Sequence, residues 1–224
     1  MPSTNDEDQY NEGDGDDGNE LLEFLKLNQN IKQLHIRDIN ISSMILNLIK
    51  SFQNLTHLYL SDYKCFSDIN IASINSSVQI NLSYLEIYLP IDNGILHTLT
   101  RQFPNLTGLN IISLDLAFSS LCSTISNFKK LKNLKLVDYI QFHESNKLDI
   151  QNFENLQSIE FLAYVQTKFE LFNFNVHNCS KLKFIKFKTY DYAEEFEVPD
   201  LSPELKNWRL VYFPRKLSFY RINQ

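Results

Sequence analysis

The 224-residue chain is poor in glycine, cysteine and long apolar runs, and each scarcity excludes a class of protein. Three of its five glycines lie within the first 18 residues, which leaves too few for a phosphate-binding glycine loop. Three cysteines, without Cys-x-x-Cys spacing, predict neither a disulfide framework nor a zinc site. No run of 18 apolar residues occurs, so we expect no membrane span and no membrane partner.

Signatures of catalysis and metal binding are also missing. The five histidines show no His-Glu-x-x-His or comparable metal spacing. Neither a Gly-x-Ser-x-Gly motif nor a Cys-His signature stands out. We therefore predict that the protein is not an enzyme, and we expect no catalytic residue, no metal and no cofactor.

Negative charge is concentrated at the N-terminus. Residues 1–20 hold eight Asp or Glu and no Lys or Arg, whereas the remaining 204 residues hold 21 basic and 19 acidic groups, a net charge of +2. Because an acidic segment without apolar periodicity cannot offset its ordering entropy, residues 1–19 are predicted to be a disordered tail. They also lack the basic and apolar order of a secretory signal, so we expect a cytoplasmic or nuclear protein. Six Asn-x-Ser/Thr triplets, including those at Asn54, Asn81 and Asn105, are accordingly interpreted as chance rather than as glycosylation sites.

A short apolar pattern, L-x-x-L-x-L, recurs along the chain and is its strongest signal. The clearest copy is Leu55, Leu58 and Leu60 within FQNLTHLYLSDY. Eight copies begin 23 to 27 residues apart, a spacing typical of repeat proteins. The eight copies are Ile31/Leu34/Ile36, Leu55/Leu58/Leu60, Leu82/Leu85/Ile87, Leu106/Leu109/Ile111, Leu131/Leu134/Leu136, Leu156/Ile159/Phe161, Leu182/Ile185/Phe187 and Leu205/Trp208/Leu210.

Two flanking positions support the same phase. A Phe stands three residues before the pattern in four repeats, and Cys179 takes that place in a fifth. The position eight residues after the first apolar residue is aromatic in five of eight repeats, so we expect it to pack. Its occupants are Ile39, Tyr63, Pro90, Leu114, Tyr139, Tyr164, Tyr190 and Phe213.

These features resemble the leucine-rich repeat family, whose consensus is L-x-x-L-x-L-x-x-N/C-x-L with 20 to 29 residues per repeat. The resemblance covers residues 28–213 and is strongest to intracellular ribonuclease-inhibitor-like and F-box-associated arrays, without a visible F-box. Mostly Tyr stands at the N/C position here. The resemblance implies an α/β solenoid, a right-handed superhelix with a curved parallel β-sheet on its concave face and helices and irregular segments on its convex face. We expect one such domain of about eight repeats over residues 20–224.

The segments between the apolar patterns predict different structures along the chain. Helical spacing predicts helices within 41–52, 93–103 and 116–128, and a capping helix at 19–27. Segments 146–153, 168–178 and 194–204 contain β-branched, aromatic or proline residues and are predicted to be extended or irregular. Residues 217–222 repeat the apolar spacing after only 12 residues and are predicted to be a closing strand.

Side chains of a strand alternate between its two faces, so the letters between the apolar ones should form a solvent-exposed surface. That surface is polar and aromatic at its start, apolar in its middle and basic at its end. The letter between the second and third apolar positions gives His35, Tyr59, Glu86, Asn110, Lys135, Glu160, Lys186 and Arg209. The letter after the third gives Arg37, Ser61, Tyr88, Ile112, Val137, Leu162, Lys188 and Val211. These residues, apart from Ser61 and Val211 and with the addition of Asp62 and Tyr84, are the candidate protein-binding set.

Parts of this set have a purely structural alternative. Three neighbouring charges of alternating sign can stabilise a sheet without any ligand, and Tyr favours strands in general. An apolar patch facing water, by contrast, usually marks a contact site, and Tyr is frequent in binding hot spots. The charges are Lys135, Glu160 and Lys186; the apolar patch is Ile112, Val137 and Leu162; the aromatic trio is Tyr59, Tyr84 and Tyr88.

The leading interpretation is a non-enzymatic protein–protein interaction module that binds a protein partner through the concave face. The resemblance implies an alternative, a substrate-recognition subunit of an SCF-type ubiquitin ligase with ligase components as partners. A third interpretation is an acidic-tailed chaperone of basic proteins. Nucleic acid is a poor candidate, because the folded part carries only +2 and its basic end adjoins the acidic segment 191–200. The basic end comprises Lys183, Lys186, Lys188, Lys206 and Arg209.

Overall fold

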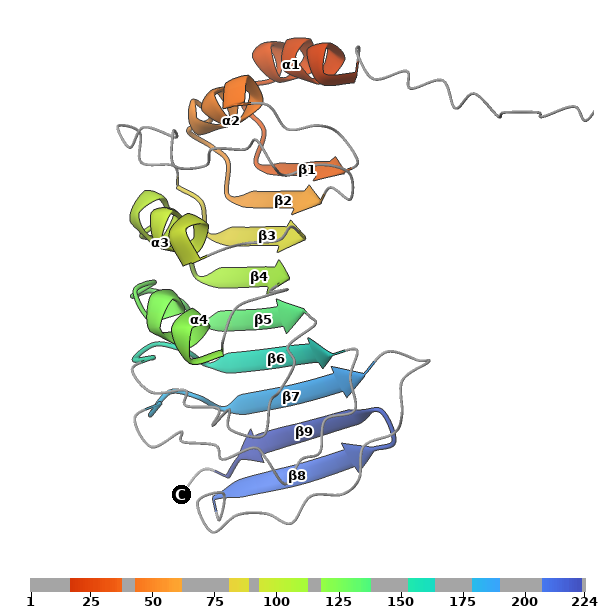
Figure 1. Cartoon of the computed structure of the whole chain (residues 1–224), viewed down its shortest axis with the longest axis vertical. Coiled ribbons are helices and arrows are strands. Elements are labelled where there is room, and N and C mark those ends of the chain that lie inside the picture. The colour runs from red at the N-terminus through yellow and green to blue at the C-terminus, as the bar shows by residue number, and fades with distance from the viewer. Residues whose placement is uncertain are drawn as a thin grey trace, which may run out of the picture.

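The computed structural model describes residues 17–37, 43–61, 81–88, 93–112, 118–137, 153–163, 179–189 and 207–222. These residues form an α/β structure with one open sheet of nine strands (Figure 1). The strands are β1 (Gln33–Arg37), β2 (His57–Ser61), β3 (Tyr84–Tyr88), β4 (Gly108–Ile112), β5 (Asn133–Val137), β6 (Ser158–Ala163), β7 (Phe184–Thr189), β8 (Trp208–Phe213) and β9 (Lys216–Arg221). The helices are α1 (Asp17–Leu27), α2 (Ser43–Lys50), α3 (Asn93–Gln102) and α4 (Phe118–Ile125).

The strands are stacked along the longest axis of the molecule in the order β1-β2-β3-β4-β5-β6-β7-β9-β8 (Figure 1). From β1 to β7 every neighbouring pair is parallel, and the sheet is not closed into a barrel. The second apolar letter of the repeated pattern is in register across these seven strands. The aligned residues are Leu34, Leu58, Leu85, Leu109, Leu134, Ile159 and Ile185.

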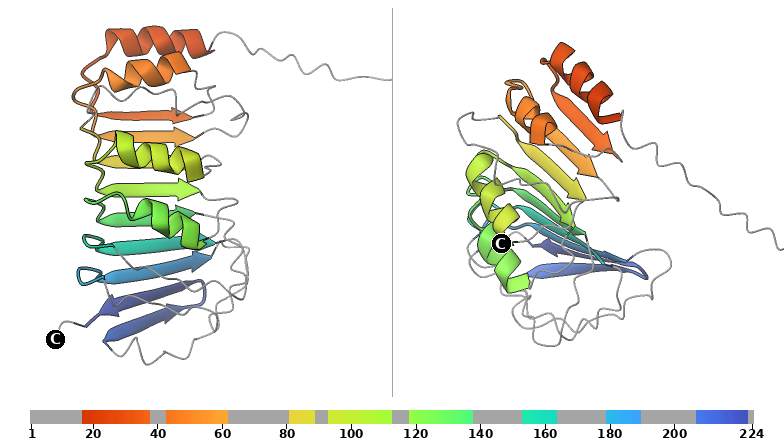
Figure 2. Two further views of the ribbon diagram at one scale, coloured as in Figure 1. Left: turned by 60° about the vertical axis from the view of Figure 1, so that its left-hand side comes forward. Right: turned by 45° about the horizontal axis from the view of Figure 1, so that its top comes forward.

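Helices α2, α3 and α4 lie over one face of the sheet (Figure 2). Apolar helix residues such as Ile49, Leu96 and Leu121 are buried in the same core cluster as the aligned strand residues. Helix spacing and strand alternation therefore bury their apolar residues in the same layer. The three predicted helices are confirmed. Helix α1 is confirmed as well, but it begins at Asp17, two residues earlier than predicted, within the expected tail.

The Phe position before each strand is part of this core. Phe52, Phe103, Phe128 and Phe153 are all buried, and so is Cys179 in the corresponding place. The second flanking position lies outside the described residues except for Phe213, which is 53% exposed. Tail residues 1–16, Asp62 and the segments 146–152, 168–178 and 194–204, predicted to be extended or irregular, also lie outside them.

The edge of the sheet where the parallel strands begin carries a hydrogen-bond ladder that the repeat pattern alone did not predict. The hydroxyls of Thr56, Ser83 and Thr107 each donate to a backbone carbonyl one repeat earlier, at 3.0, 3.1 and 3.0 Å. Beside them, Asn54 Nδ2 donates to Asn30 Oδ1 at 3.3 Å. Further along, Lys130 Nζ and Lys181 Nζ donate to the side-chain oxygens of Asn105 and Asn155, at 2.7 and 2.6 Å. The hydroxyls of three of the Asn-x-Ser/Thr triplets thus have a structural role.

The last two strands correct the predicted order of the repeats. The eighth pattern was expected to lie next to the seventh, yet β9 is inserted between β7 and β8 and is antiparallel to both. A two-residue turn, Pro214-Arg215, joins β8 and β9 into a hairpin. The hairpin places Leu217 and Phe219, the most deeply buried residues of β9, beside Phe187 and Ile185 of β7. The predicted closing strand is therefore confirmed, but it is the inner strand of the hairpin.

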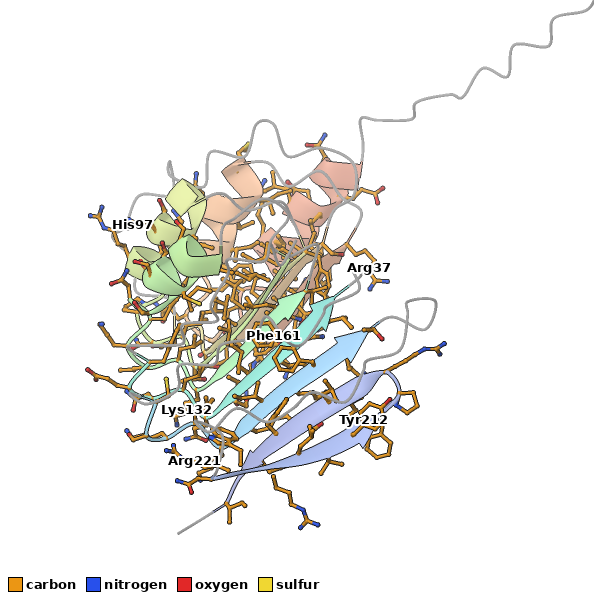
Figure 3. The ribbon with its side chains drawn as sticks, turned by 60° about the horizontal axis from the view of Figure 1, so that its bottom comes forward. Arg37, His97, Lys132, Phe161, Tyr212 and Arg221 are labelled. Atoms are coloured by element: carbon orange, nitrogen blue, oxygen red, sulfur yellow. The ribbon has the colours of Figure 1, made fainter. Side chains whose placement is uncertain are left out.

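Arg221, at the end of β9, fastens this hairpin to the turn before β7. Its Nη1 donates to the carbonyls of Cys179 and Ser180, both at 2.9 Å, and to Leu182 O at 3.4 Å. Its guanidinium also lies over the ring of Trp208, 5.8 Å from the centroid. Figure 3 shows Arg221 at the same edge as Lys132, while Arg37 lies at the opposite edge, where β1 ends.

Candidate functional site

We call the face of the sheet opposite α2, α3 and α4 the open face (Figure 2). Strand pairing aligns its side chains in rows that cross all nine strands. The middle row is His35, Tyr59, Glu86, Asn110, Lys135, Glu160, Lys186, Ser218 and Val211. Most candidate binding residues are thus brought onto one surface, as predicted.

Stacked rings dominate the open face over β1, β2 and β3. His35 and Tyr59 are stacked with ring centroids 3.8 Å apart and planes 16° apart. Tyr84 contacts both rings of β2: its centroid is 5.4 Å from that of Tyr59 and 5.6 Å from that of His57. The rings of these four residues form what we call the aromatic cluster. His57 was missed from sequence, although it stands at the repeat position of Tyr84, one letter before the second apolar residue.

Tyr84 is fixed by contacts on two sides. Its ring covers Gly108 of the next strand so closely that a Cβ at position 108 would lie 2.5 Å from Tyr84 Cδ2. Its hydroxyl donates a hydrogen bond of 2.8 Å to Glu86 Oε2. Burial, followed by the hydrogen bond to the Glu86 carboxylate and its charge, raises the pKa of Tyr84 above its ordinary value. The hydroxyl therefore remains a donor at neutral pH, and Gly108 has a role that its lack of a side chain concealed.

Asn110 lies next to Glu86 in the middle row, and it is buried rather than exposed. Only 2% of its surface is accessible, so the prediction that it faces solvent is wrong. Its Nδ2 donates to the Tyr88 hydroxyl at 3.2 Å, whereas its Oδ1 is buried with no hydrogen-bond partner among the described residues. Replacing Asn110 with Ala would remove this bond and leave space between longer neighbours.

The charged part of the middle row is a pair rather than a series of three. Lys186 Nζ contacts Glu160 Oε2 at 2.5 Å, and the two side chains are 17% and 25% exposed. Lys135 precedes them in register but makes no ion pair within the described part of the chain. The structural alternative for this region is therefore confirmed for Glu160 and Lys186 alone.

The predicted apolar patch is smaller than expected. Val137 is only 3% exposed, so the expectation that it faces water is wrong, while Leu162 is half-buried. Val137 and Leu162 are aligned on the neighbouring strands β5 and β6. Ile112 aligns with Val137, but its side chain is outside the described set.

The basic end is rearranged by the C-terminal hairpin. Arg209 was predicted to follow Lys186, but it pairs with Tyr220, and Ser218 takes the place next to Lys186. Lys188 faces Lys216, a residue that was missed because β8 was expected next to β7. Arg37, a further candidate binding residue, follows His35 by two positions on β1 and is exposed at the end of that strand (Figure 3).

Other chemistry is not evident in the described ranges. They contain no group of three or more His, Cys, Asp or Glu arranged for a metal ion, and Cys122 and Cys179 are buried. None of their helices is long and apolar enough to cross a membrane. No protein-family model matches the chain, and no curated protein matches it.

Proposed function

We propose that the chain is a leucine-rich repeat solenoid that acts as a non-enzymatic protein–protein interaction module. The in-register pattern over seven parallel strands, with helices on one face, supports this proposal. In the proposed solenoid the open face is the concave, partner-binding side. The module would work in the cytoplasm or nucleus, where buried cysteines such as Cys122 remain reduced.

The aromatic cluster is the observation that carries this proposal. Tyr59 and Tyr84 are half-buried on rigid strands, and their rings are held by neighbouring rings and by Glu86. Tyr is one of the residue types that contribute most to protein-binding hot spots, because it offers a large apolar surface together with a polar end. Rings that are already fixed lose little conformational entropy when a partner binds.

Affinity purification of the tagged full-length chain from its native cells tests the proposal. We expect a partner that the wild-type chain retains and Tyr59→Ala loses. The control is His97→Ala, which changes an exposed residue of α3 (Figure 3). Thermal unfolding of both variants would show that they are folded. Equal retention by all three proteins, or equal loss with both variants, would contradict a partner site at the aromatic cluster.

A further inference from the structure

Two carboxylates occupy the middle row of the open face, but only one is paired with a cation. Glu160 contacts Lys186, as described above. Glu86 is also half-buried, yet within the described ranges no Lys, Arg or His lies within ion-pairing distance of it. Its hydrogen bond from the neutral Tyr84 hydroxyl leaves its negative charge uncompensated. A half-buried charge of this kind gains from a counter-ion, because the groups around it exclude water.

The surroundings of Glu86 favour a positively charged group. The rings of Tyr59 and Tyr84 lie on the preceding and the same strand, and the faces of such rings attract cations. Asn110, aligned with Glu86 on the next strand, has an Oδ1 without a hydrogen-bond donor among the described residues. The Glu86 carboxylate thus lies among aromatic residues and is aligned with Asn110, whose amide oxygen has no hydrogen-bond donor among the described residues; the carboxylate itself has a neutral donor but no cation.

The cations of the sheet do not fill this position. Lys135 is the nearest cation of the same row, and it lies on β5, two strands from Glu86. Arg37 lies on β1, two strands away on the other side and at the end of its strand (Figure 3). Neither side chain forms an ion pair with Glu86.

We propose that Tyr59, Tyr84, Glu86 and Asn110 bind an arginine side chain of the protein partner. The guanidinium pairs with the Glu86 carboxylate and lies against the tyrosine rings, and a further N–H group donates to Asn110 Oδ1 once the side chains that bury this atom are displaced. Arginine fits this set better than lysine, since its planar group combines stacking with several donors in fixed directions. This inference rests on the proposed function, because it specifies which partner group the open face recognises.

Titration of the isotope-labelled full-length chain with N-acetyl-argininamide, followed by NMR, tests the arginine site directly. We expect saturable shifts of the Gly108 amide, which lies under the Tyr84 ring. N-acetyl-citrullinamide, the neutral isostere, should bind at least about tenfold more weakly, because charge-assisted hydrogen bonds are roughly twice as strong as neutral ones. N-acetyl-lysinamide should also bind more weakly than the arginine compound.

Two isosteric variants make the test specific. Glu86→Gln should weaken binding of the arginine compound about tenfold while keeping an acceptor for the Tyr84 hydroxyl. Glu160→Gln, the matched control, should leave this binding unchanged. Tyr59→Leu, which retains an apolar side chain, should also weaken it through loss of the ring.

Three results would overturn the arginine site: no saturable binding, equal binding of the citrulline compound, or unchanged binding by Glu86→Gln. Equal binding of the lysine compound would overturn the assignment to a guanidinium. A partner that needs Tyr59 but tolerates Glu86→Gln would refute this site and leave the interaction module intact. If the arginine compound binds as expected but affinity purification finds no partner that depends on Tyr59, the interaction module is refuted.

Discussion

The two halves of the open face satisfy their charges differently, although they share one core. Over β1 to β4 the open face carries the aromatic cluster, and Glu86 has no cation among the described residues. Over β6 to β9, Glu160 is paired with Lys186, and lysines surround the pair. A charge that is paired within the sheet contributes to stability, whereas an unpaired one is available to a partner. We propose on this basis that the first half serves recognition and the second serves stabilisation.

The largest expected effects test whether both halves share the same core. Leu109→Ala in the first half and Ile185→Ala in the second should each lower the free energy of unfolding by about 2–5 kcal/mol, because both side chains are almost fully buried. Urea-induced unfolding measures this loss. Lys135→Ala, on the open face, should cost less than about 0.5 kcal/mol. A large loss in one half only would mean that the core is not continuous.

A smaller loss is expected from Gly108→Ala in the aromatic half. The added methyl group would meet the Tyr84 ring, and displacing that ring should cost about 1–3 kcal/mol and disturb its contact with Tyr59. Thermal unfolding and the NMR signals of the tyrosine rings report both effects. Gly18→Ala is the control, since nothing lies near the added methyl group there, and it should keep or raise stability. An unchanged melting temperature for Gly108→Ala would contradict the tight contact.

The two middle-row carboxylates provide the sharpest test of the comparison. Lys186→Gln, which breaks the ion pair with Glu160, should lower the free energy of unfolding by about 1–2 kcal/mol. Glu86→Gln should change it by less than about 0.5 kcal/mol, because no ion pair is lost. Urea unfolding at low and high salt measures both values. Equal losses would mean that Glu86 is also paired within the protein.

The smallest effect concerns pH. The pKa of Tyr84 is raised in the folded state above its ordinary value of 10.0, by burial first and then by Glu86. The folded state therefore holds this proton more tightly than the unfolded chain, so its contribution is complete below pH 10 and decreases as the pH rises further. Unfolding measured between about pH 8 and 11 should show a shallower alkaline loss in Tyr84→Phe than in wild type. Identical slopes would contradict the raised pKa.

The repeated pattern was sufficient to predict the parallel strands β1 to β7 and their register. The spacing that aligns Leu58 with Leu85 also aligns the residues of the opposite face, such as Tyr59 and Glu86, because successive side chains of a strand point to opposite faces. Helices α2, α3 and α4 followed from their apolar spacing. The apolar spacing of the sequence was therefore enough to predict these strands and helices.

The burial of individual side chains in the candidate site and the order of the last two strands could not be predicted from the apolar pattern. Alternation indicates which face Asn110 and Val137 occupy, but their burial depends on the size of side chains on neighbouring strands. The apolar pattern also continues into β8, so only the Pro214-Arg215 turn indicated a hairpin. Whether β8 or β9 pairs with β7 depends on how deeply Leu217 and Phe219 can be buried, a tertiary property.

The inserted strand has a consequence for the order in which the protein is made. Each of strands β2 to β7 can pair with the preceding strand as soon as it leaves the ribosome, since chains emerge N-terminus first. The free edge of β7 must wait until β9 has been synthesised as far as Arg221, which grips the turn before β7. During translation, completion of the sheet is therefore delayed past β8 to the last strand of the chain.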